Sequence, residues 1–83
     1  MLTVFVESAF RHGCDEEDFY EVLESAPLKL RSRRGFEGVF ELYGRNLAGD
    51  YLHIAYRRET ERYVVFHMRR MTPSERRFYS QHR

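Results

Sequence analysis

The sequence has little cysteine and no long hydrophobic run. Cys14 is the only cysteine among 83 residues, so an internal disulfide cannot form and the Cys/His spacing of a zinc site is absent. No apolar segment approaches the roughly 18 to 20 residues that cross a bilayer. The amino-terminal segment MLTVFVE also lacks the positive region and the small-residue cleavage site of a secretory signal. We therefore expect a cytoplasmic protein that makes no contact with a membrane and folds by packing alone.

The signatures of several enzyme classes are missing as well. The chain contains no Walker loop, no dinucleotide-binding fingerprint and no nucleophile elbow. Many of its acidic residues cluster at 15–24, without histidine at the spacing of a metal ligand, and they do not suggest the carboxylate pair of a glycosidase. We expect neither a metal site nor a cofactor.

The charges that are present are unevenly distributed, although the net charge is only +1. Residues 1–27 carry seven acidic side chains and one basic one, a net −6, whereas residues 28–83 carry thirteen basic and six acidic side chains, a net +7. Twelve of the thirteen basic residues are arginine, and Lys29 is the only lysine. Because the planar guanidinium binds phosphate or carboxylate bidentately, this bias favours recognition of such anions.

The chain is long enough for one domain, residues 1–83, and too short for two. Apolar residues recur at helical spacing after the acidic cluster, which predicts an amphipathic helix over 15–26 that ends at Pro27. Thr72, Pro73 and Glu75 have the capping pattern of a helix start, so we also predict a carboxy-terminal helix.

Strands are predicted between and before these helices. An apolar strand is expected at 2–7, and an edge strand beginning at Leu28 that loosens at Gly35. Three β-rich segments, 38–46, 51–59 and 62–70, read as an antiparallel meander. The expected fold is thus α+β, with an antiparallel sheet of the meander and one or two shorter strands, packed against the two helices.

Alternation along the meander assigns its side chains to two faces. The predicted apolar face, which we expect the helices to cover, contains Phe40, Leu42, Leu52, Ile54, Tyr56, Val64, Phe66 and Met68. The same alternation places Tyr63 and Val65 on the opposite face. The polar residues of that uncovered face are Tyr43, Arg45, His53, Arg57, His67 and Arg69.

A face of arginine, histidine and tyrosine suits the metal-free cleavage of RNA. Histidine can take or give a proton because its ordinary pKa of ~6.5 is near working pH. Arginine stabilises the charge that grows on the phosphate, and tyrosine can stack on an unpaired base. The simpler alternative is that these residues form only the solvated face of an antiparallel sheet.

The chain from Arg11 to Tyr79 resembles the BrnT family of small toxins, within the RelE-like ribonucleases of type II toxin–antitoxin pairs. The similar segments are RHGCDEEDFYEVLES, LYGRNLAGDYLHIAY and VVFHMRRMTPSERRFY, which occur in the family's order and spacing. The resemblance implies a RelE-like fold and an endoribonuclease that inhibits translation. It also implies neutralisation by a BrnA-like ribbon-helix-helix antitoxin, with a homodimer or a toxin–antitoxin heterotetramer as the assembly.

The resemblance also implies functional residues. Its basic positions fall on Arg11, Arg45 and Arg69, with His12 as a further candidate. The family usually has lysine at the position of Arg11 and a small residue at that of His67, so we expect His67 to be another candidate for proton transfer. Contacts to RNA are expected from Tyr43, His53, Arg57, Arg70 and Arg76. One alternative is a binding module of the same fold that binds an acidic protein or a nucleic acid without cleaving it. Another is a purely structural subunit, in which a second copy covers the open face.

Overall fold

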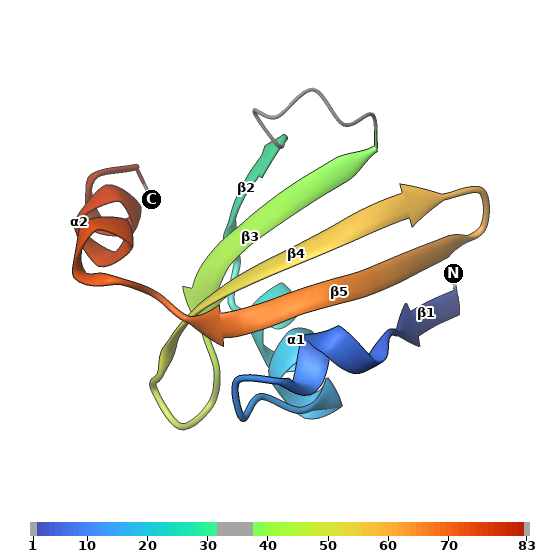
Figure 1. Ribbon diagram of the computed structural model, residues 1–83. Helices are drawn as coiled ribbons and strands as arrows, with labels where there is room; N and C mark the ends of the chain where they lie inside the picture. Colours follow the sequence, from blue (N-terminus) through green and yellow to red (C-terminus); the bar gives the residue numbers. More distant parts are fainter. Residues whose placement is uncertain (1, 32–37, 83) are drawn as a thin grey trace.

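The protein forms a five-stranded β-sheet with an α-helix on each face (Figure 1). The structure is a computed structural model that describes residues 2–31 and 38–82. The elements are β1 (Leu2–Phe5), the 3₁₀ helix η1 (Glu7–Phe10), α1 (Glu16–Glu24), β2 (Leu28–Arg31), β3 (Val39–Arg45), β4 (Tyr51–Glu59), β5 (Arg62–Arg70) and α2 (Pro73–His82). The α+β class is therefore confirmed. Gly35, where the edge strand was expected to loosen, lies outside the described residues. Among the helices of the described part, none is long and apolar enough to cross a membrane.

The sheet is mixed rather than purely antiparallel. Its strand order is β1-β5-β4-β3-β2, in which β3, β4 and β5 form the expected antiparallel meander and β2 is an edge strand. β1 runs parallel to β5, with Val4 opposite Val64, so the expectation of an antiparallel sheet is wrong at this strand. The short segment LTVF is apolar enough to pair in either direction, and its sequence carries no signal that distinguishes them.

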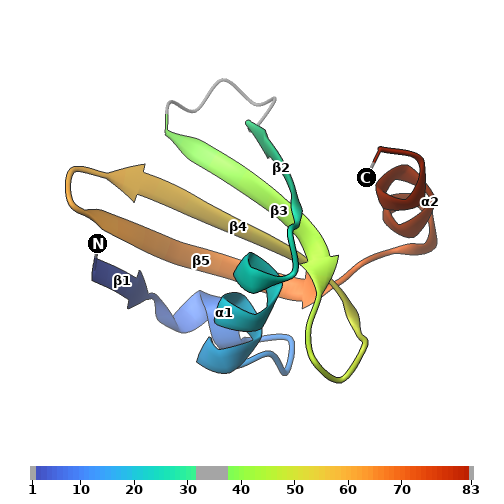
Figure 2. The ribbon, with the colours of Figure 1, turned by 180° about the vertical axis from the view of Figure 1, so that it is seen from behind.

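α1 covers one face of the sheet, which we call the closed face (Figure 2). The helix begins with a capping box, in which the backbone N–H of Asp18 donates to the Asp15 side chain and that of Asp15 donates to the Asp18 side chain. Phe19 and Val22 of α1 are buried in the apolar cluster of this face. The strands contribute to this cluster the buried residues Leu42, Leu52, Ile54, Tyr56, Val65 and Met68.

The end of α1 lies very close to β3. The helix ends at Glu24 rather than at the predicted Ala26, whose φ of 56° is not helical and which precedes a proline, where the α conformation is disfavoured. A Cβ atom on Gly44 would meet Ser25 Oγ at 2.9 Å and Val22 Cγ1 at 3.0 Å. Glycine at this position of β3 therefore lets the helix approach the backbone of the strand.

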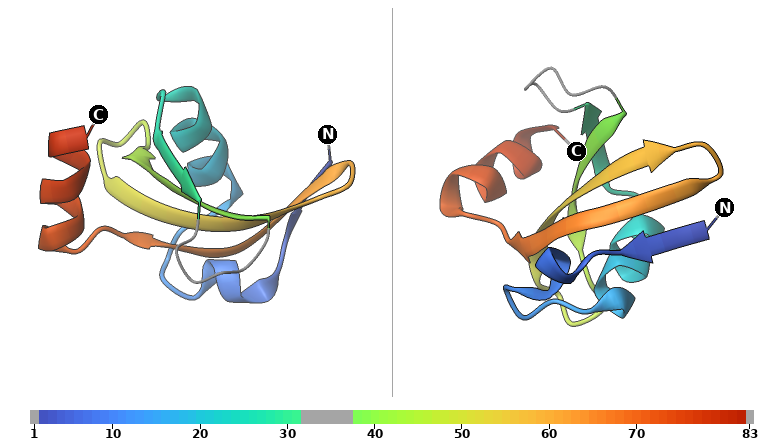
Figure 3. Two further views of the ribbon diagram at one scale, coloured as in Figure 1. Left: turned by 90° about the horizontal axis from the view of Figure 1, so that it is seen from above. Right: turned by 45° about the vertical axis from the view of Figure 1, so that its right-hand side comes forward.

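α2 packs against the opposite face, which we call the groove face. Tyr79 of α2 is buried together with Tyr43 of β3 and Met71, and the partly buried residues around them are Leu28, Leu30, Tyr51 and Phe78. Tyr43 follows Leu42 of the closed face in the strand, so the two side chains point to opposite sides. The expectation that both helices cover one face is thus wrong: α2 stands at one end of the strands, away from α1 (Figure 3).

A β-bulge in β5 changes which of its residues face α1. Ala55 of β4 pairs with His67, but the next residue, Tyr56, pairs with Val65, so Phe66 is the extra residue. Beyond the bulge the predicted alternation is reversed: Val65 is in the cluster of the closed face and Tyr63 packs against it. The prediction that Val64 and Phe66 share the closed face is therefore wrong. The run of apolar residues at 64–66 gives no alternation from which the bulge could be predicted.

Candidate functional site

An open groove of about 940 Å³ lies on the groove face beside α2. It is lined by Leu30, Arg31, Val39, Glu41, Tyr43, His53, Ala55, Arg57, Phe66, His67, Arg69, Ser74, Glu75 and Phe78. Half of the ten predicted site residues line it, namely Tyr43, His53, Arg57, His67 and Arg69. The groove therefore brings together an aromatic wall, histidines and both signs of charge.

The register of the sheet explains why the polar residues meet. Tyr43 of β3 pairs with His53 of β4, which in turn pairs with Arg69 of β5, so the three form one row across the sheet. In the next row, Glu41 pairs with Ala55, which pairs with His67. Ala55 has a small side chain between these two, which leaves the floor of the groove open above it. Both rows follow from the pairing of the strands alone, because residues directly opposite each other in neighbouring strands point to the same face of the sheet.

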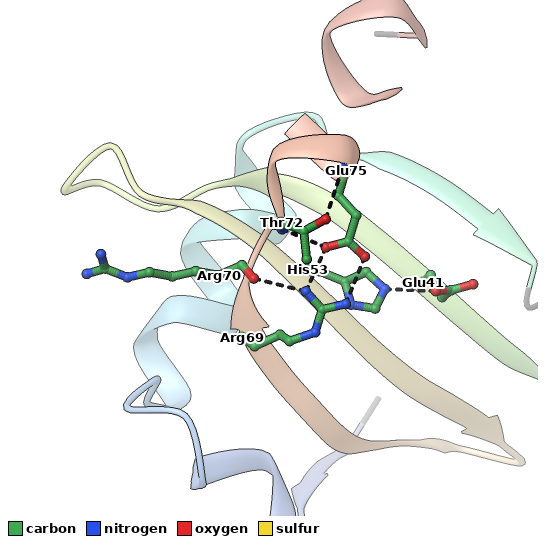
Figure 4. Close-up of polar contacts among 6 residues, drawn as sticks. All are labelled: Glu41, His53, Arg69, Arg70, Thr72 and Glu75. Carbon is green, nitrogen blue, oxygen red and sulfur yellow. Dashed lines mark hydrogen bonds and ion pairs between the residues drawn. The ribbon is translucent and has the colours of Figure 1, made fainter. Parts of the chain in front are cut away.

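Arg69 is held by Glu75 from the first turn of α2 (Figure 4). Its Nη1 donates to Glu75 Oε1 at 2.6 Å and its Nη2 donates to Glu75 Oε2 at 2.8 Å, a bidentate ion pair. Nη1 also donates to the backbone oxygen of Arg70 at 3.0 Å. The hydrogen bonds from Arg69, assisted by one from the backbone of Thr72, lower the pKa of Glu75 to about 2. Arg69 therefore faces the groove with its charge already compensated.

Glu75 has a second role in the same place. Its Oε1 accepts from the backbone N–H of Thr72 at 2.9 Å, and the N–H of Glu75 donates to Thr72 Oγ1 at 3.2 Å. This is the capping box predicted from the sequence, and it fixes the start of α2. One carboxylate thus ties the helix to the end of β5 through both the cap and Arg69.

His53 is the buried histidine of the groove, with 6% of its surface exposed. Its Nε2 lies 2.8 Å from Oε1 of Glu41, and because an ionised carboxylate can only accept, Nε2–H is the donor. Its Nδ1 is buried and has no hydrogen-bond partner among the described residues. The ring packs against Tyr43, with centroids 4.8 Å apart. Glu41 and Tyr43 therefore fix the orientation of His53 from two sides.

His67 is the half-buried histidine beside it. Its ring centroid lies 5.4 Å from that of His53 and 5.7 Å from that of His12. Burial lowers the pKa of His67, and the neighbouring His53, Arg69 and His12 lower it further. The neutral form of the ring is thus favoured near neutral pH. His12 is exposed and lies next to His67, outside the groove lining.

The other predicted site residues lie elsewhere. Arg45 and Arg76 both contact the ring of Tyr51, beyond the groove, at 4.7 Å and 4.0 Å from its centroid. Arg70 points away from Arg69 (Figure 4) and its Nη2 lies 3.7 Å from Asp50 Oδ1. Arg11 is exposed next to His12, outside the groove lining. Of the three basic positions implied by the family resemblance, only Arg69 lines the groove.

Sequence reasoning missed the two carboxylates of the groove. Glu41 was not among the predicted site residues, and Glu75 was interpreted only as a helix cap. Glu41 lies diagonally across the strand pair from His53, so the predicted pairing of β3 with β4 contained a signal for their contact. The Arg69–Glu75 pair depends on where α2 turns, which no local pattern specifies.

The chemistry available in the groove is proton transfer combined with charge stabilisation. Although three histidines are close together, no three histidine, cysteine or carboxylate side chains within 2–31 and 38–82 are arranged to hold a metal ion. Comparison of the chain with protein-family models, curated proteins and solved structures gives no match. A neutral histidine next to an arginine and an aromatic wall is suited to a substrate that carries both a phosphate and an unpaired base.

Proposed function

We propose that the protein is a metal-independent endoribonuclease that cleaves single-stranded RNA in the groove. The observation that carries the proposal is His67, a half-buried histidine with a lowered pKa whose ring is in contact with those of His12 and His53 and which is close to Arg69. A base for the 2′-hydroxyl must be neutral at working pH, and the environment of His67 favours that form. Phe66 and Phe78, which line the groove and are half-buried, offer aromatic surface to the base of a nucleotide.

The proposed reaction transfers two protons and exchanges one bond at phosphorus. Neutral His67 takes the proton of the 2′-hydroxyl, whose oxygen attacks the adjacent phosphorus. The bond from phosphorus to the 5′ oxygen breaks, and that oxygen takes a proton from His12, leaving a 2′,3′-cyclic phosphate and a 5′-hydroxyl. We assign the acid to His12 rather than His53, because His12 is exposed whereas His53 is buried and bound to Glu41. Arg57 stabilises the charge on the phosphate oxygens with its terminal nitrogens, since only its Nε contacts Glu59.

The test is cleavage of a fluorescent single-stranded RNA in the presence of EDTA, with the ends of the products identified. We expect cyclic phosphate ends, and a loss of about a hundredfold to ten-thousandfold in kcat for His67→Ala. Arg58→Ala is the control, because this exposed arginine lies on the opposite face of the sheet and outside the groove lining, and its rate should equal that of the wild type. Because the pKa of His67 is lowered, activity should be lost in acid with a midpoint below ~6.5, the ordinary pKa of histidine. Intact RNA at high protein concentration would contradict the proposal.

The resemblance to BrnT toxins extends this proposal to the cell. RNA cleavage would inhibit translation, and a ribbon-helix-helix antitoxin would neutralise the protein. Expression of the wild type should arrest growth unless the adjacent reading frame is co-expressed, while His67→Ala should be tolerated. Growth arrest that persists with the inactive variant would show that toxicity does not come from cleavage.

A second candidate is a binding module without catalysis, because the ion pairs of the groove leave fewer cations to stabilise the charge of a transition state. Both terminal nitrogens of Arg69 are bound by Glu75, and Nε of Arg57 lies 2.8 Å from Glu59 Oε2, so two of the groove's cations already have carboxylate partners. A module of this kind would bind an acidic protein or RNA with an affinity that falls steeply with salt and would leave the RNA intact. The cleavage assay therefore separates the two functions.

A further inference from the structure

Tyr51 is the first residue of β4, next to the β3–β4 loop and outside the groove, and two arginines contact its ring. Arg45 comes from the end of β3 and pairs with Tyr51 across the strands, while Arg76 comes from α2. Their Cζ atoms lie 4.7 Å and 4.0 Å from the same ring centroid, so the distance between the two cations cannot exceed the sum of these values. Elements distant in the sequence thus bring two like charges together at one half-buried aromatic residue.

Neither arginine has an acidic partner among the described residues. Two other arginines on this side of the sheet do contact a carboxylate, Arg57 that of Glu59 and Arg69 that of Glu75. Arg45 instead donates from Nε to the backbone oxygen of Gly49 at 3.2 Å, which leaves its terminal nitrogens available. Like charges held close together repel, and this cost is offset when an anion binds both of them.

The position of this pair relative to the groove fits a second contact on one extended ligand. Tyr51 lies four residues from Ala55 along β4, and Ala55 pairs with His67. At a rise of about 3.4 Å per residue the two positions are about 14 Å apart on the same face of the sheet. The arginine pair therefore lies beyond the reach of the one phosphate that reacts at His67, but within reach of another phosphate of the same strand.

We propose that Arg45, Tyr51 and Arg76 form a clamp for a second backbone phosphate of single-stranded RNA, separate from the site of cleavage. The inference rests on the proposed function, since it assumes that the groove binds RNA. Two guanidinium groups contact the phosphate from both sides, and the ring of Tyr51 keeps them in place by cation–π contact. The clamp would increase affinity for longer RNA and set which bond of the strand lies at His67.

The test compares the binding of two 2′-O-methyl oligouridylates, which lack the attacking hydroxyl and cannot be cleaved by this reaction. One is a dinucleotide, which fills only the groove, and the other is an octanucleotide, which also reaches the clamp. We expect Arg45→Gln/Arg76→Gln to weaken octanucleotide binding by tenfold or more and to leave dinucleotide binding unchanged. The dependence of log K on log salt should become shallower by about 0.7 for each phosphate that the variant no longer binds.

A matched control removes two positive charges from the opposite face. Lys29 and Arg58 are exposed cations at positions that alternate with the groove face, and Lys29→Gln/Arg58→Gln changes the net charge equally. This control should retain most of its affinity for the octanucleotide. Arg45→Lys/Arg76→Lys keeps the charge but loses the planar fork, and should fall between the wild type and the glutamine variant. Thermal unfolding confirms that each variant is folded.

Three outcomes would overturn the clamp. Unchanged octanucleotide binding in Arg45→Gln/Arg76→Gln would show that the two arginines form no clamp, and it would leave the proposed function intact. Equal weakening of both probes would mean that the two arginines belong to the site of cleavage. Binding of neither probe by the wild type would remove the proposed function itself, and the clamp with it.

Discussion

The two faces of the sheet are built from the same strands but are stabilised in different ways. On the closed face, Ile54 and Met68 have no exposed surface and pack among apolar side chains beneath α1. On the groove face, the neighbouring residues His53 and Arg69 are held by carboxylates, and the surface remains open beside α2. Because side chains alternate along a strand, one residue step separates a position that supports the fold from one that faces the groove. The two properties can therefore be changed independently.

The largest expected effect is on the closed face. Ile54→Ala removes a fully buried side chain and leaves a cavity under α1, which should lower the free energy of unfolding by about 2 to 5 kcal/mol. On the groove face, Arg57→Ala removes an exposed side chain and should change it by only about 0.5 kcal/mol. Urea unfolding monitored by circular dichroism measures both. Equal losses would show that the two faces do not differ in their contribution to stability.

The next effect concerns the contact of α1 with β3. A methyl group at Gly44 would overlap Ser25 Oγ and Val22 Cγ1, so Gly44→Ala should destabilise the protein by about 1 to 3 kcal/mol. Adding Ser25→Ala removes one of the two overlapping atoms and should restore part of the loss. Thermal unfolding of the single and double variants measures this coupling. No recovery in the double variant would mean that the helix shifts as a whole.

The smallest effect concerns the ion pair that ties α2 to the groove face. The pKa of Glu75 is about 2, below its usual 4.5, so the pair stabilises the fold above about pH 4.5 and this contribution is lost as the pH falls through about 2. Glu75→Gln should cost roughly 1 to 2 kcal/mol at pH 7, allowing for partial exposure, and nearly nothing at pH 2. Unfolding midpoints measured across this range test the difference. A cost that does not change with pH would assign the loss to the helix cap instead.

Local patterns predicted the elements of the fold well. The strand alternation, the turns between β-rich segments and the Thr72–Glu75 cap lie within a few residues of one another, so the sequence itself carries their signals. The three strands of the meander and the start of α2 were predicted to within a residue or two at each end. Leu42, Leu52 and Ile54 were also assigned correctly to the face that α1 covers.

The features that could not be predicted depend on contacts between distant parts of the chain. The parallel pairing of β1 brings residues 2–5 beside residues 62–65 and has no local signal. The direction of α2 decides that Arg69 is paired with Glu75 and that Arg76 reaches Tyr51 rather than the groove. The polar face itself was predicted, whereas the carboxylates that neutralise part of it were not.

The bulge at Phe66 also affects how this chain should be compared with others. Deleting this one residue would make Val65 and His67 neighbours opposite Tyr56 and Ala55, which restores a regular ladder. Each of the remaining side chains of β5 would still point to the same face of the sheet as before. The same deletion at another position in the strand would reverse the facing of the residues that follow it. A relative one residue shorter in β5 can therefore keep the residues that match His67 and Arg69 in the groove, although it lacks the lining side chain of Phe66. An alignment that allows no gap inside a strand would place its groove histidine one position away from His67.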